Sequence, residues 1–61
     1  MTKQEILNSM EIISNARNAL LEQVYALAEE RRANEAYLLH PAIDALQAKF
    51  TDLYEMYSEA A

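Results

Sequence analysis

The feature that most constrains this chain is the near absence of residues that turn a backbone. Its 61 residues contain no glycine and a single proline, Pro41, whereas alanine, leucine and glutamate are frequent. Tight turns and left-handed backbone depend mainly on glycine, while alanine, leucine and glutamate have high helix propensity. The sequence therefore predicts an all-α fold with few interruptions.

The first predicted helix covers residues 3–33. It opens with a capping box, in which the Thr2 hydroxyl accepts from the Glu5 amide and the Glu5 carboxylate accepts from the Thr2 amide. The polar stretch 14–18 is the weakest part, but we expect one continuous helix through it. Apolar residues recur at alternating spacings of four and three, as in a heptad repeat. The a and d positions of this repeat are Ile6, Met10, Ile13, Arg17, Leu20, Val24, Leu27 and Arg31.

A second amphipathic helix is predicted over about 41–58, after a connector at about 34–40. Within the connector, residues 35–39 either form a single helical turn or prolong the first helix. Asn34 tolerates the left-handed conformation of a residue just past a helix end, and Pro41 suits the first position of a new helix. A residue before proline is disfavoured in the helical region, so His40 is expected outside the helix. Beyond the proline, the three-four spacing resumes at Ile43, Leu46, Phe50, Leu53 and Tyr57.

The two predicted helices differ in length, at roughly 46 Å and roughly 27 Å for their numbers of residues. Folded as an antiparallel hairpin, the shorter helix covers only about residues 16–33 of the longer one. An apolar stripe at the start of the first helix is then left for a second copy or another protein to cover. We expect a single hairpin domain over residues 1–61 that dimerises into a helical bundle. The stripe left uncovered is Ile6, Leu7, Met10, Ile12 and Ile13.

Two further residues are candidate contacts with a partner. Arg17 occupies a core position of the heptad repeat. Its charge either specifies the register of association or reaches solvent while the aliphatic stem packs, and the sequence leaves both interpretations open. Tyr37 lies in an apolar part of the connector, and tyrosine is enriched in binding surfaces. Both residues join the predicted interaction surface.

The combinations of residues that usually carry catalysis or bind metals are missing from the sequence. The chain has no cysteine and one histidine, His40, which alone cannot complete a common metal-ligand set. It contains no glycine-rich phosphate loop and no cysteine nucleophile. Ten acidic residues against five basic ones give a net charge of −5, which argues against a general binder of nucleic acid. We therefore expect a non-catalytic protein without a cofactor or a metal.

The opening residues 1–5, Met-Thr-Lys-Gln-Glu, and a gapped match at Leu20-Leu21-Glu22 resemble the Rop family of plasmid copy-number regulators. That family consists of homodimeric helical hairpins that bind paired RNA stem-loops. The resemblance implies a dimeric hairpin and an RNA-binding function. Among the polar residues that the family directs at RNA, Lys3 has a counterpart by position.

The leading interpretation of the sequence is a small helical protein that regulates or inhibits a protein partner by binding it. Its short, acidic, helical character is similar in style to host-inhibiting proteins of bacteriophages. No apolar run approaches the roughly 20 residues of a membrane span, and no secretory signal pattern is present, so we expect a cytoplasmic location without membrane contact. A Rop-like, RNA-binding homodimer is the alternative, although nucleic acid is not the expected partner.

Overall fold

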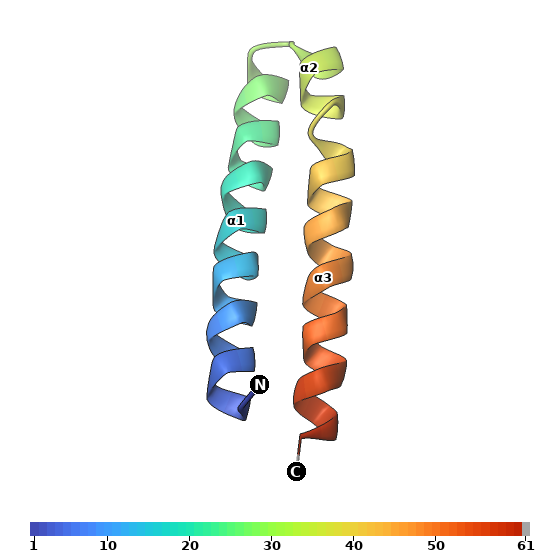
Figure 1. Ribbon diagram of the computed structural model, residues 1–61. Coiled ribbons are helices and arrows are strands. Elements are labelled where there is room, and N and C mark those ends of the chain that lie inside the picture. The colour runs from blue at the N-terminus through green and yellow to red at the C-terminus, as the bar shows by residue number, and fades with distance from the viewer. Residues whose placement is uncertain (61) are drawn as a thin grey trace.

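The computed structural model describes residues 1–60. Helix α1 spans Lys3–Glu29, α2 spans Ala33–Tyr37 and α3 spans His40–Glu59, and no strand occurs among these residues. The chain reverses direction between α1 and α2, and α3 returns alongside α1 (Figure 1). The result is a rod with extents of 47 × 15 × 12 Å. The prediction of an all-α protein is confirmed.

Helix α1 begins where the sequence predicts. The Glu5 amide donates to the Thr2 hydroxyl over 3.1 Å, and the Thr2 amide donates to the Glu5 carboxylate over 3.0 Å. The capping box therefore forms as expected. The hydrogen bond from the Thr2 backbone, with a smaller contribution from its side chain, holds the pKa of Glu5 below its ordinary value of 4.5. The helix then continues without a break through residues 14–18, as predicted.

Helix α1 ends at Glu29, before the predicted residue 33, in a Schellman-type turn. Arg31 adopts the left-handed conformation, with φ 61°. Its amide donates to the carbonyl of Ala28 over 3.1 Å, and the amide of Arg32 donates to the carbonyl of Leu27 over 2.9 Å. These bonds satisfy carbonyl groups that a helix end otherwise leaves without donors. Because the chain has no glycine, a residue with a Cβ takes the left-handed position.

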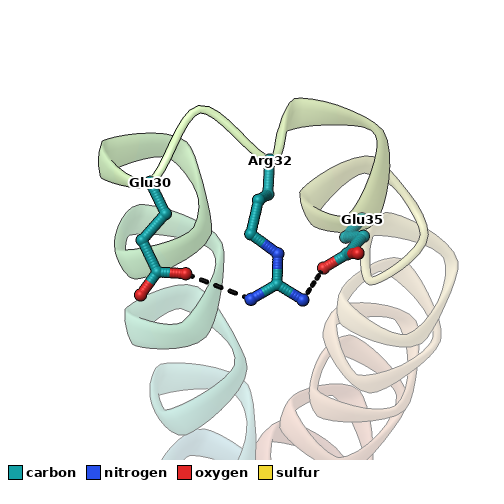
Figure 2. A network of polar contacts seen from close by, with 3 residues as sticks. All are labelled: Glu30, Arg32 and Glu35. Atoms are coloured by element: carbon teal, nitrogen blue, oxygen red, sulfur yellow. Dashed lines mark hydrogen bonds and ion pairs between the residues drawn. The ribbon is translucent and has the colours of Figure 1, made fainter.

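Ion pairs connect the residues on the two sides of the turn. The Arg32 guanidinium donates to the Glu30 carboxylate over 3.1 Å and also pairs with Glu35 in α2 (Figure 2). Hydrogen bonds to Glu30 and then Glu35 raise the pKa of Arg32, but such exposed pairs contribute little stability. Asn34, the predicted left-handed residue, lies inside α2. That prediction was wrong because the turn bonds already close around Arg31.

Pro41 lies in the first turn of α3, as predicted, but the arm that returns along α1 already begins at Ala33 with α2. Helix α2 ends at Tyr37, whose carbonyl would receive no hydrogen bond from a helical proline four residues later and would clash with its ring. Residues 38–39 keep right-handed helical angles, and their amides bond to carbonyls three residues back. His40, expected outside the helix, is the first residue of α3. We call residues 33–59 the returning arm.

The predicted mismatch in length was wrong, because the reversal lies at residues 30–32 and not at 34–40. The returning arm therefore reaches the start of α1 (Figure 1). Ile6, expected to lack a partner within the chain, is only 2% exposed, and Leu53 of α3 is also buried. At the same end, Lys3 Nζ lies 4.9 Å from the centre of the Tyr57 ring.

The core is a single layer of side chains between α1 and the returning arm. Among the described residues, the buried apolar side chains are Ile6, Ala36 and Leu53. Two helices alone can cover each other along one stripe, so the rest of the stripe stays half-buried and open on two sides. The half-buried residues include Met10, Ile13, Arg17, Leu20, Val24, Leu27, Leu39, Ile43, Leu46, Phe50 and Tyr57.

Candidate interaction surfaces

The groove between the helices is hollowed on both of its open sides. On α1, Ser9 and Ile12 lie on one side of the core stripe, and Ser14 and Leu21 lie on the other, as helical geometry requires. The larger hollow, of about 390 Å³, lies near the chain ends. We call it the terminal hollow, and its lining is Met1, Ser9, Ile12, Ile13, Lys49, Leu53 and Met56.

The terminal hollow is mostly apolar and carries one cationic side chain. Ile12 is 67% exposed and Met56 is 41% exposed, whereas Leu53 is buried at the groove between the helices. Lys49 is the ionisable side chain in the lining, and it forms no ion pair with any of residues 1–60. The hollow therefore combines apolar walls with a lysine side chain that is free to meet an anion.

The opposite side carries two smaller, adjoining hollows. One, of about 210 Å³, is formed by Leu21, Val24, His40, Ile43 and Asp44. The other, of about 120 Å³, is formed by Ser14, Arg17, Gln47 and Phe50. We call these nine residues together the Arg17 face. It is more polar than the terminal hollow and holds both a cation and a carboxylate.

Arg17 is the unusual residue of its face. The Nε atom is enclosed by the protein, yet it finds no hydrogen-bond acceptor anywhere in residues 1–60. Buried polar groups are normally hydrogen-bonded, because leaving one without a partner forfeits its interaction with water. Both sequence interpretations of Arg17 stay open, since the side chain is half-buried and part of its guanidinium group is shut off from solvent.

The structure divides the predicted interaction residues among several places. Ile12 and Ile13 share the terminal hollow, whereas Arg17 lies on the opposite face. Ile6 is core, and Met10 is half-buried in the stripe between the helices. Leu7 is 40% exposed. Tyr37 is exposed near the reversal, where its ring centre lies 5.2 Å from that of His40.

Sequence reasoning missed the contribution of α3 to the terminal hollow. Lys49 and Met56 are seven residues apart, so they lie on one side of α3, and Leu53 falls between them on the core stripe. This spacing is visible in the sequence. Its pairing with Ile12 is not, because the predicted hairpin placed α3 against a later part of α1.

Within the described part of the chain, no three His, Cys, Asp or Glu side chains gather in a way that could hold a metal ion. Every helix in that part is too short or too polar to cross a membrane. Comparison with protein-family models, with curated proteins and with solved structures yields no match. The resemblance to the Rop family remains an expectation from the sequence.

Proposed function

We propose that this protein is a cytoplasmic, non-catalytic interaction module, built as a helical hairpin that self-associates and regulates or inhibits a protein partner by binding it. The observation that carries the proposal is the terminal hollow, where apolar side chains stay exposed although the two helices pack along their whole length. The occupant that fits it is an amphipathic helix of the partner.

The apolar walls provide most of the binding energy in this proposal. Burial of a whole isoleucine side chain contributes about 1.5–3 kcal/mol. Because Ile12 is 67% exposed, roughly two thirds of that contribution, about 1–2 kcal/mol, is still available for an intermolecular contact. Met56 adds a flexible side chain of the kind that adapts to a partner's surface.

The shape and charge of the hollow favour a helix with one acidic residue. The hollow runs between two helices, and a third helix fits such a groove through apolar residues spaced three and four apart. Lys49 lies in the lining without an ion pair among residues 1–60, so a carboxylate on the incoming helix would gain a charged hydrogen bond. The occupant is therefore an apolar helix face with an acidic residue beside it.

Photo-crosslinking in cells of the natural host tests this proposal. A photoreactive phenylalanine analogue at position 12 should form adducts with one protein partner, and Met56→Asp in the same chain should abolish them. The analogue at Asn15, an exposed position one turn away and outside the hollow, is the matched control. Equal adducts at both positions, or none at position 12, would refute the site. Adducts with RNA would favour the Rop-like alternative.

A further inference from the structure

On the Arg17 face, the chain itself supplies no hydrogen-bond acceptor or ion-pair partner for Arg17. The Nε atom of Arg17 is enclosed and has no hydrogen-bond partner in residues 1–60. The chain carries twice as many acidic as basic residues, yet Arg17 forms no ion pair with any described residue. Because the Arg17 side chain is only half-buried and forms no ion pair among residues 1–60, a carboxylate brought by another molecule would gain a charged hydrogen bond from its guanidinium group.

The same face offers a carboxylate of its own, displaced along the rod. Gln47 shares the hollow of Arg17, and Asp44 precedes Gln47 by three residues. Asp44 therefore lies about 4.5 Å further along the rod, one helical turn away, where it lines the neighbouring hollow with Leu21 and Val24. A cation on α1 and a carboxylate on α3, one helical turn apart along the rod, form a self-complementary pattern.

We propose that a second copy of this chain covers the Arg17 face, related by a two-fold axis parallel to the helices. This axis places α1 of each copy against the returning arm of the other at the same height. Arg17 then faces the partner's Gln47 and can reach the partner's Asp44. Because the symmetry is reciprocal, two Arg17–Asp44 pairs form. This inference rests on the self-association proposed above and specifies its surface.

An axis perpendicular to the helices is disfavoured by charge. It would place α1 of one copy antiparallel to α1 of the other. Arg17 lies one residue from the middle of α1, which spans Lys3–Glu29, so a central perpendicular axis would bring the two Arg17 side chains together. Like charges at close range in a partly dry interface repel, whereas the parallel axis replaces that repulsion with attraction.

Two exposed apolar residues extend the same face toward the chain ends. Leu7 precedes Ser14 by seven residues, and Tyr54 follows Gln47 by seven, so both continue the Arg17 face. Leu7 is 40% exposed and Tyr54 is 56% exposed. The parallel axis places Leu7 of each copy within about one helical turn of the partner's Tyr54, so that contact between them would remove both side chains from water.

The solvent-accessible area of one chain is also larger than that of a compact protein of its mass, as expected if a second copy covers part of it. The chain exposes 4664 Å², whereas a compact protein of its mass exposes about 4,000 Å². The excess, about 600 Å², approaches the roughly 800 Å² that each partner buries in an interface of standard size. A radius of gyration of 14.2 Å, against about 10.5 Å for a compact chain of this length, agrees with an elongated unit that is completed by association.

Charge reversal tests the reciprocal pair in the full-length chain. Sedimentation equilibrium should show that Arg17→Asp and Asp44→Arg each weaken the dimer by about tenfold or more, while the double variant regains most of the loss. Glu22→Arg, an exposed reversal off this face, is the control and should leave the dimer intact. Single variants without effect, or a double variant that only adds the two losses, would overturn the proposed face.

Disulfide trapping gives a second readout that does not depend on Arg17. The natural chain has no cysteine, so single Leu7→Cys and Tyr54→Cys proteins can be mixed and oxidised. We expect a mixed disulfide dimer to form much faster than either homodimer. Faster trapping of Leu7→Cys with itself, or no trapping above the background of an unfolded control, would overturn the parallel axis.

The failures of this inference and of the proposed function are distinguishable. A wild-type chain that stays monomeric at high micromolar concentration overturns both this interface and the proposed self-association. A dimer that is insensitive to charge reversal overturns the interface alone. If the analogue at position 12 forms no adducts with a partner while the dimer is unchanged, the terminal hollow is not the binding site. The proposed interface at the Arg17 face would then still stand.

Discussion

Replacement of Arg31 by glycine tests the turn that sets the whole arrangement of the helices. Arg31 holds φ at 61°. The left-handed conformation costs a residue with a Cβ about 1–2 kcal/mol, whereas glycine has no such penalty. Glycine is also freer in the unfolded chain, which offsets roughly 0.5–1 kcal/mol of this relief. We therefore expect Arg31→Gly to raise the free energy of unfolding by about 0.5–1 kcal/mol.

Thermal unfolding followed by circular dichroism measures this gain. For a chain of this size, the expected change corresponds to a rise of about 2–8 °C in the melting temperature. All samples need the same chain concentration, because association makes the melting temperature depend on concentration. Arg31 is exposed, so the loss of its side chain should leave packing unchanged.

A second glycine, three residues earlier, is the matched control. Ala28 is exposed and lies inside α1, where glycine is unfavourable. Ala28→Gly should lower the free energy of unfolding by about 0.5–1 kcal/mol, opposite in sign to the change at position 31. If both glycine variants lose stability equally, residue 31 is not left-handed and the reversal at residues 30–32 is refuted.

Three other substitutions examine a helix start and the interruption of the returning arm. Thr2→Ala should lower the free energy of unfolding by about 1 kcal/mol in chemical denaturation at neutral pH. Because the capping box lowers the pKa of Glu5 in the folded state, its contribution is present above pH 4.5 and is lost as the pH falls through the lowered value. The melting temperature of Thr2→Ala should consequently fall less on acidification than that of the wild type. Pro41→Ala should be nearly neutral in thermal unfolding, since a restored hydrogen bond to Tyr37 is offset by greater freedom of the unfolded chain. Ala48→Pro, within α3, should cost about 3 kcal/mol or more, and equal effects of the two changes would contradict the position of the interruption.

The parts of the fold that local chemistry determines could be predicted from the sequence. Thr2 and Glu5 are three residues apart and cap a helix wherever they occur in this spacing, so the start of α1 was predictable. The three-four spacing of apolar residues predicted the stripe that α1 and α3 bury against each other. The absence of glycine and proline from residues 3–33 predicted that residues 14–18 stay helical, although the stripe position within them is Arg17.

The reversal could not be predicted in the same way. Arginine has no preference for the left-handed conformation, so nothing local marks Arg31 as the turning point. Pro41 was the stronger local signal, but a proline suits both the first turn of a helix and an interruption within a helical arm. The choice between these is made by tertiary packing, in which the returning arm covers Ile6 of α1 and α1 covers Leu53 of the returning arm.

The candidate site shows the same limit. Ile12 was predicted as an interaction residue because α3 was expected to be too short to reach it. Ile12 is exposed for a different reason, since it lies on the outer side of the core stripe while α3 passes beside it. Lys49 and Met56 were missed because their place in the hollow depends on how α3 aligns with α1. That alignment follows from where the chain turns.

The start of α1 and the end of α3 lie side by side, as the closeness of Lys3 and Tyr57 shows. The molecule should therefore resist least when its two ends are pulled apart. A force that pulls its two ends apart acts perpendicular to the helix pair and breaks the contacts between α1 and α3 one level at a time. The contacts near the chain ends, including those of Ile6 and Leu53, would break first. The Schellman turn at Arg31 would be loaded last. Such peeling needs far less force than sliding the helices past each other, whatever the melting temperature. A single-molecule experiment should find a chain that unzips from its open end.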